Sequence, residues 1–124
     1  MTMMMYAAPF MGMPKMDIAG MLGTMVVTRR AAATTPGMVM HFMAGVIFAL
    51  IYALLWSLGL GSATWWWGLI FGAVHGAGAV VMMPIMMRIN PRRPEMPAGP
   101  LMTMGLMMGH LIYGLIVALV YAVF

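Results

Sequence analysis

The sequence lacks cysteine altogether and holds little charge. Because none of its 124 residues is cysteine, disulfide bonds and thiolate metal sites are excluded. Charged residues make up only 6% of the chain, and its two acids, Asp17 and Glu95, both lie near expected loops. A proton-coupled carrier usually places carboxylates within its membrane spans, and this chain offers only histidines there.

Serine is scarce as well. Ser57 and Ser62 are the two serines of the chain, and neither is near a histidine in the sequence. No nucleophile–base–orienter set can be recognised, so we expect no enzymatic activity. The net charge of +4 comes from six basic residues divided between two connections. They form no stripe that could follow a phosphate backbone, which excludes nucleic acid as a partner.

Apolar residues are what the chain has in abundance. Hydrophobic residues make up 65% of it, and its mean hydropathy is +1.01. A soluble domain of this size could not bury so much apolar surface in one core, so lipid is the expected solvent. Three apolar segments, residues 38–57, 63–89 and 101–124, reach the roughly 20 residues that a helix needs to cross a bilayer.

The N-terminal region is apolar but too short to cross. As a helix, residues 1–13 would be only about 20 Å long. Asp17 is placed to cap a second short helix over residues 17–28, because its carboxylate can accept hydrogen bonds from the free N–H groups of the first turn. That helix carries no charge before Arg29, so we expect it to lie at the membrane interface.

An internal repeat relates the first and last spans. Aligned at an offset of 69 residues, segments 38–55 and 107–124 agree at eight of eighteen positions, among them a histidine, a glycine and a tyrosine. A weaker match pairs Pro9 with Pro84. Together these features predict an all-α, polytopic membrane helical bundle of two tandem helix hairpins. It would have three full spans and a partial N-terminal helix in one membrane domain, residues 1–124.

Small residues recur at every fourth position in each predicted span. Positions four apart share a face of an α-helix, and small residues at this spacing mark close helix–helix contacts in membranes. The expected packing residues are Gly45, Ala49 and Ala53 in the first span, Gly68, Gly72 and Gly76 in the second, and Gly114, Ala118 and Ala122 in the third.

Each span also contains one histidine on or beside its stripe, so His41, His75 and His110 should face protein rather than lipid. An ionisable residue within a span is a functional hypothesis by default. The repeat places His41 and His110 at matching depths, and His75 deeper and separate from them. The alternative is that neutral imidazoles form hydrogen bonds across a packed interface.

Methionine is concentrated in one half of the expected bilayer. The chain has 21 methionines, and none falls between Ala44 and Val81. Thioethers are soft ligands suited to Cu(I), and they are also adaptable packing material. The candidate metal or pigment ligands are therefore His41, His75, His110, Met38, Met107 and Met108.

Charge predicts the orientation. The basic residues lie in two connections that fall on the same side of the membrane: Lys15, Arg29, Arg30, Arg88, Arg92 and Arg93. The positive-inside rule makes that side cytoplasmic, in the inner membrane of the cell, and places the C-terminus outside. Trp56 and the run of residues 65–67 lie at the opposite interface, where indole rings set the depth of a helix.

Two stretches, "APFMGMPKMDIAGMLGT" and "MMGHLIYGLIVALVY", carry a family resemblance. The chain resembles small, uncharacterised, methionine- and glycine-rich prokaryotic integral membrane proteins with four predicted helices. Those proteins show a similar "MGMPKMD" turn after the first helix and a "GHLIYG"-type start to the last. The resemblance implies a four-helix membrane fold with no assigned activity. The chain departs from it in having only part of the first helix.

Three functions fit these features. The first is a structural or accessory subunit that packs against other membrane proteins or against copies of itself, because the stripes offer more interface than so small a bundle needs. The second is a Cu(I)-like soft metal site or path built from His41, His110 and methionines. The third is ligation of haem or a chlorophyll-type pigment by a histidine of a span, with nearby glycines leaving room for the ring.

The charge distribution makes a direct prediction of topology. A reporter fused after Phe124 should be active if it works only outside the cytoplasm, because all six basic residues lie on the other side. The measurement is a pair of C-terminal fusions, one reporter active on each side of the membrane. Activity of the cytoplasmic reporter alone would contradict the predicted orientation.

Overall fold

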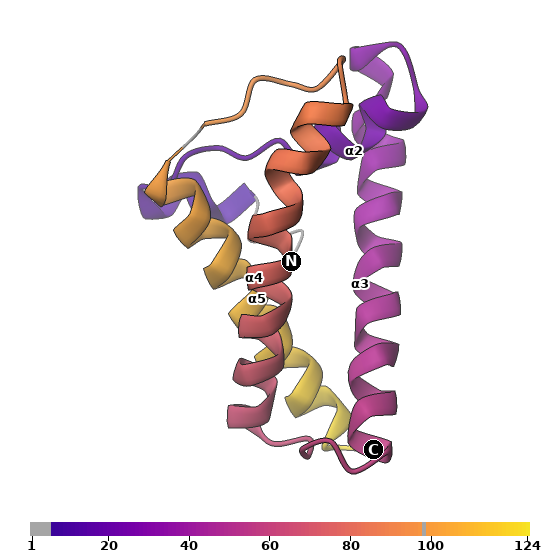
Figure 1. Ribbon diagram of the computed structural model, residues 1–124, viewed down its shortest axis with the longest axis vertical. Helices are drawn as coiled ribbons and strands as arrows, with labels where there is room; N and C mark the ends of the chain where they lie inside the picture. The colour runs from indigo at the N-terminus through magenta and orange to yellow at the C-terminus, as the bar shows by residue number, and fades with distance from the viewer. Residues whose placement is uncertain (1–5, 98) are drawn as a thin grey trace.

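The computed structural model describes residues 6–97 and 99–124 (Figure 1). Among these residues there is no β-strand, and the prediction of an all-α fold is confirmed. The α-helices of the described part are α2 (Ile18–Val26), α3 (Thr34–Ser57), α4 (Trp65–Ile89) and α5 (Pro100–Tyr121), and the 3-10 helices are η1 (Ala8–Met11) and η2 (Arg30–Ala32). By length and composition, α3, α4 and α5 could each span a membrane.

The ends of the long helices differ from the expected ones by a few residues. α3 begins at Thr34 rather than Met38, and its first turn tolerates Pro36 because the first N–H groups of a helix need no intrahelical partner. α5 begins at Pro100 rather than Leu101, because a proline is equally tolerated at the first position of a helix, and it ends at Tyr121 rather than at residue 124. Helix ends fray, and sequence patterns place them only approximately.

The N-terminal region contains the capped helix that the sequence predicts. The Asp17 side chain accepts a hydrogen bond of 2.8 Å from the backbone N–H of Gly20, and α2 follows. Of the expected helix over residues 1–13, residues 1–5 lie outside the described residues, and η1 occupies part of the remainder.

The helices form two pairs. α2 packs against the start of α3. The two hairpins expected from the sequence instead pair the first span with the partial helix over residues 1–13. A close backbone contact at two glycines accounts for the packing of α2 on α3. A Cβ placed on Gly23 would lie 1.7 Å from the carbonyl oxygen of Ala33, and a Cβ on Gly37 would lie 1.7 Å from that of Ala19. Only glycine fits at either position.

α4 and α5 form the second pair and meet backbone to backbone. A Cβ on Gly72 would lie 2.5 Å from the carbonyl oxygen of His110, and a Cβ on Gly114 would lie 2.2 Å from that of Gly68. In lipid no hydrophobic force drives helices together, so association relies on close packing of this kind. The antiparallel contact between α4 and α5 is the most extensive in the fold.

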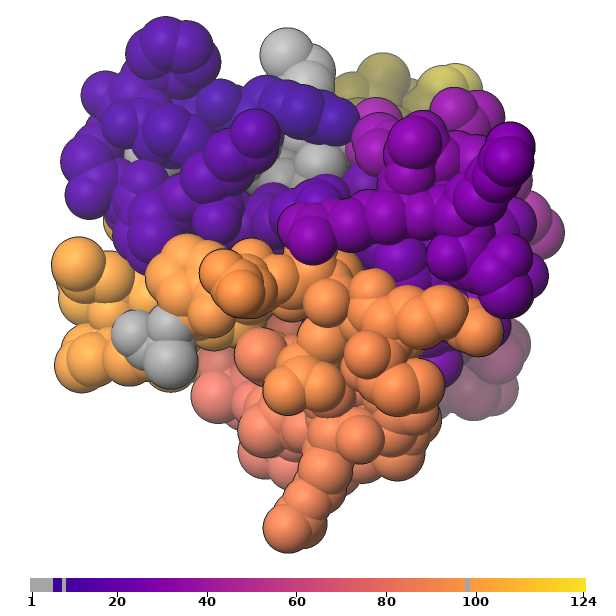
Figure 2. All heavy atoms as spheres, turned by 90° about the horizontal axis from the view of Figure 1, so that it is seen from above, coloured from indigo at the N-terminus to yellow at the C-terminus, as the bar shows by residue number. Residues whose placement is uncertain are grey.

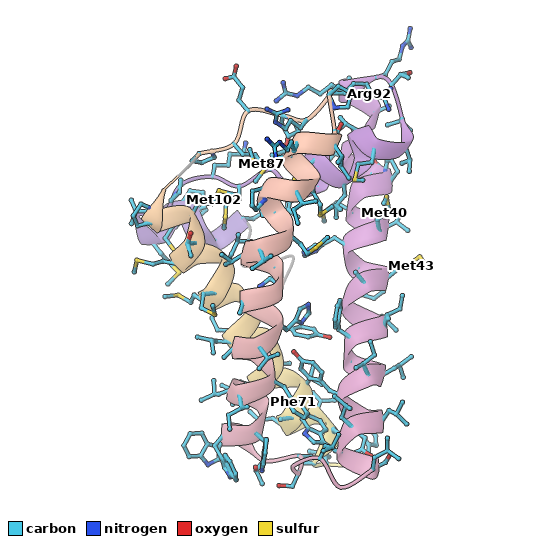
Figure 3. All side chains as sticks on the ribbon, in the orientation of Figure 1. Met40, Met43, Phe71, Met87, Arg92 and Met102 are labelled. Carbon is cyan, nitrogen blue, oxygen red and sulfur yellow. The ribbon has the colours of Figure 1, made fainter. Side chains whose placement is uncertain are left out.

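α3 stands apart from α4 and α5 over most of its length (Figure 1). Side chains rather than backbones bridge the space. Figure 3 shows aromatic side chains, Phe71 among them, between α4 and the lower half of α3. The buried members of this aromatic cluster are Tyr52 and Trp56, which pack with Ala118 of α5.

The two ends of the bundle differ in chemistry. The connections that carry Lys15, Arg29, Arg30, Arg92 and Arg93 lie together at one end, which we call the basic end (Figure 1). Figure 2 looks onto this end, where the segment up to the start of α3, indigo to purple, adjoins the orange connection between α4 and α5.

The connection between α3 and α4 lies at the other end, with the C-terminus (Figure 1). We call it the tryptophan end. Trp65 and Trp66 are exposed there, as interface anchors would be. Trp56 is only 7% exposed and stacks on Phe71 with ring centroids 5.5 Å apart, so it is a packing residue as well.

A polar contact joins the two helix pairs at the basic end. The buried side-chain amide of Asn90 donates to the carbonyl of Met21 at 2.8 Å and to the hydroxyl of Thr24 at 2.9 Å. The Nε of Arg92 donates to the carbonyl of Thr24 at 3.1 Å. The Arg92 bond satisfies the carbonyl of Thr24, which is among the last four residues of α2 and has no N–H of that helix to accept from. Asn90 follows directly after α4, which contains Pro84 in its interior.

The glycine contact between α4 and α5 gives a test with a matched control. Gly72→Ala should destabilise the fold by about 1–3 kcal/mol, because the added methyl group meets backbone atoms of α5. Gly78→Ala adds the same methyl group to the same helix with nothing within 4 Å. That change should be neutral or stabilising by up to about 1 kcal/mol. Thermal unfolding in detergent measures both, and equal effects would contradict the contact.

Candidate functional site

Two histidines and two tyrosines meet between α3, α4 and α5. His75 comes from α4, His110 and Tyr113 come from α5, and Tyr52 comes from α3. The α4–α5 glycine contact positions both histidines, because Gly72 lies against the backbone of His110 and His75 follows one helical turn later. The group lies well inside the three long helices, away from the charged connections.

The contacts around His75 favour one of its two tautomers. The Tyr52 hydroxyl donates to the carbonyl of Phe71 at 2.9 Å and lies 3.1 Å from Nδ1 of His75. A hydroxyl has one proton to donate. Both contacts of Tyr52 are hydrogen bonds at once only when Nδ1 of His75 is the donor in the second, and in that tautomer Nε2 of the neutral ring keeps its lone pair.

His110 is fixed in the same tautomer by its own helix. Its Nδ1 lies 2.7 Å from the carbonyl oxygen of Leu106. A carbonyl can only accept, so Nδ1 carries the proton and Nε2 of the neutral ring is unprotonated. The residue is buried, at 8% exposure.

The two histidine rings touch. Their centroids are 4.6 Å apart and the rings stand nearly edge to face, at 72°. His75 also stacks on Phe48 of α3, with centroids 3.8 Å apart. The repeat predicts that His75 is separate from His41 and His110, whereas in the structure its ring lies against that of His110. Rings in contact also leave no space between them for the plate of a tetrapyrrole.

The other sequence candidates lie in different surroundings. His41 is partly buried on α3. The sulfur of Met38 accepts a long contact of 3.9 Å from the Tyr6 hydroxyl. Met107 lies beside His110: its sulfur is 2.8 Å from a Cβ built on Gly76, and the Cβ of His110 is 3.1 Å from the same point.

Met108 is partly buried on α5. Within residues 6–97 and 99–124, no group of three or more His, Cys, Asp or Glu side chains gathers in a geometry that could hold a metal ion.

Methionines form a cluster between α2, α4, α5 and the connections at the basic end. Its buried members are Met16, Met21, Met83, Met102 and Leu106, and Met86, Met87 and Met96 pack against them. In Figure 3, Met87 and Met102 lie on this side of the molecule, whereas Met43 points outward from α3. The methionines thus include a core at the basic end and side chains on the outer surface.

The small-residue stripes have different surroundings on the three helices. Gly68, Gly72, Gly76, Gly114 and Ala118 are buried where α4 meets α5. Gly45, Ala49 and Ala53 of α3 are only partly buried. The one atom within 4 Å of a Cβ on Gly45 is a ring carbon of Tyr113, at 3.9 Å.

Ala122 differs from the expected packing role. It is exposed, because α5 ends one residue before it. The sequence patterns did not single out Tyr113, whose hydroxyl donates to the carbonyl of Gly45. Tyr113 follows His110 by three residues, and this spacing indicates that the two side chains lie on the same side of the helix.

A second feature lies at the tryptophan end. An open pocket of about 440 Å³ is lined by apolar side chains and loop glycines: Leu55, Gly59, Leu60, Gly61, Trp67 and Phe71. Its lining offers aromatic and aliphatic contact and almost no hydrogen-bonding groups, so it has little means of selecting a polar ligand.

Comparisons with models of protein families, with curated proteins and with solved structures find no match to this chain. The resemblance to four-helix membrane proteins therefore gains no support from a related sequence. The four described helices agree with it at the level of helix number.

The tyrosine contact to α3 can be tested by removing one oxygen. Tyr113→Phe should destabilise the fold by roughly 1 kcal/mol, because the interhelical hydrogen bond to Gly45 is lost while the ring stays. Tyr121→Phe is the control, since Tyr121 is exposed and the change keeps its ring, which packs against that of Trp56. Thermal unfolding in detergent compares them. A loss for Tyr121→Phe as large as that for Tyr113→Phe would contradict the assignment.

Proposed function

We propose that this protein is an accessory subunit of a membrane protein assembly and that α3 is the helix that packs against its partner. The basic end faces the cytoplasm in this proposal, in keeping with the positive-inside rule. The observation that carries the proposal is the poor internal packing of α3.

Beyond the contact of its first turns with α2, α3 has little contact with the rest of its own chain. In its most apolar stretch of 18 residues, 6% is buried within the protein, compared with 28% for α5. The glycines of α4 and α5 are already used in the contact between those helices. α3 is joined to them mainly by aromatic side chains and tyrosine hydrogen bonds. These leave most of its surface free for another helix.

The outer face of α3 is a continuous apolar stripe. Its members are exposed and recur at helical spacing: Val39, Phe42, Val46, Leu50 and Leu54. Side chains three and four positions apart line one face of a helix and can interlock with a facing helix. Packing between side chains is what holds helices together in lipid. A partner of this chemistry is a transmembrane helix of another subunit.

The absence of cysteine makes a direct test possible. A single cysteine at Val46, on the outer face of α3, carries a photoreactive cross-linker in native membranes. A single cysteine at Val74, on the exposed outer side of α4, is the matched control. We expect one adduct of defined mass from position 46 and none from position 74, because only α3 would lie against a partner.

Each other outcome has a definite meaning. An adduct from position 46 alone with twice the mass of the chain would make the partner a second copy of the chain and would contradict a separate larger subunit. No adduct at position 46, or the same smear from both positions, would show that lipid covers α3 and would overturn the proposal.

A further inference from the structure

We propose that His75, His110 and Met107 form a binding site for a soft monovalent metal ion, Cu(I) being the natural example. This site is distinct from the accessory role proposed for α3. It also differs from the histidine pair that the sequence indicates, because His75 takes the place of His41.

The tautomers of the two histidines prepare them as ligands. A metal-binding imidazole must present an unprotonated nitrogen, and a hydrogen bond from the other ring nitrogen usually fixes that state. His110 donates from Nδ1 to the carbonyl of Leu106, and His75 donates from Nδ1 to the oxygen of Tyr52. Both Nε2 lone pairs are therefore available, on rings whose centroids are 4.6 Å apart.

The separation of the rings suits a shared ion. Imidazole nitrogens bind metal ions at about 2.0 Å, so two nitrogens on one ion lie within about 4 Å of each other. Ring centroids 4.6 Å apart are compatible with this separation of the nitrogens. The backbone contact at Gly72 holds the two helices at this separation.

Met107 supplies the soft ligand. It precedes His110 by three residues, so the two side chains share a side of α5. Its sulfur lies over Gly76, the residue that follows His75 on α4, and any side chain at Gly76 would displace it. The absence of a Cβ at Gly76 thus makes the space that the thioether occupies beside the histidines.

The charge balance selects the ion. Asp17 and Glu95 lie outside the three long helices, so no carboxylate is available to neutralise a cation there. Two imidazoles and a thioether are neutral, and a bound ion keeps its full charge. The cost of placing an ion in a medium of low polarity is very large for an unneutralised charge. A monovalent ion is therefore favoured over Zn²⁺, and a thioether selects for softness.

The methionine cluster gives such an ion a route. Met16, Met21, Met83 and Met102 are buried between the basic end and the level of Leu106. Leu106 immediately precedes Met107, so these buried thioethers lie next to the proposed site, on the side of the basic end. Each is a weak soft ligand, and together they would offer an entering ion a path to the histidines.

The experiment is a binding titration on the full chain in detergent. Cu(I) is presented in competition with a chromophoric chelator, and Ag(I) and Zn(II) are run in parallel. We expect one Cu(I) or Ag(I) per chain and no comparable binding of Zn(II). X-ray absorption of the copper-loaded protein should show mixed nitrogen and sulfur ligation.

Variants assign the ligands. His75→Ala and His110→Ala should each weaken Cu(I) binding by more than about 100-fold, since loss of a ligand costs at least as much as loss of its hydrogen-bonding partner. Met107→Leu keeps the shape of the side chain and should weaken binding by about tenfold or more. Met104→Leu, on the exposed side of the same helix, should bind like the wild type. His41→Ala should remain within a few-fold of it.

Several results would overturn the proposal. These are the absence of Cu(I) binding by the wild type, copper ligation without sulfur, or Met107→Leu binding as tightly as Met104→Leu. Loss of binding in His41→Ala with retention in His75→Ala would assign the ion to the other histidine pair and refute this site. Met107→Leu decides the matter even if the histidine variants fail to fold.

Discussion

The backbone contact between α4 and α5 is the constraint on which the rest of the structure depends. Glycines let the two helices approach until a built Cβ would lie 2.2–2.6 Å from the opposite carbonyl oxygens. Because Gly72 lies on the backbone of His110, the ring of His75 on the next turn meets the ring of His110. Lipid supplies no hydrophobic force to replace this packing, so the glycines hold both the bundle and its polar interior.

α3 is held by a different kind of contact. Tyr52 and Tyr113 reach across with hydroxyl groups that bond to backbone carbonyls, and aromatic rings occupy the remaining space. A carbonyl within a helix has a second lone pair to offer, so these bonds form without breaking the helix that accepts them. The two helix pairs are joined a second time through Asn90 at the basic end. Beyond its packing on α2, α3 is therefore fixed at a few points rather than along a surface.

Local rules explain how much of this the sequence could reveal. Apolar length predicted three helices that could span a membrane, and the four-residue spacing of small residues marked the faces of α4 and α5 that meet. The same spacing on α3 could not tell which neighbour it would face, or that tyrosine side chains would keep that neighbour at a distance. The repeat equated His41 with His110, but a repeat relates positions and not contacts. The meeting of His75 with His110 depends on how far α4 slides along α5, which only the glycine contact determines.

Pro84 gives α4 two parts with different mechanical properties. A proline has no N–H to donate, so the carbonyl of Val80 loses its partner in the helix, and bending is easiest at that turn. The glycines that hold α5 lie on one side of this turn, whereas Arg88 and Asn90 lie on the other. A force on the end of α4 that carries Arg88 should therefore bend the helix at Pro84 before it separates α4 from α5. Flexing of α4 is therefore expected at Pro84, whereas the part of α4 that the glycines pack against α5, with His75, lies outside that turn.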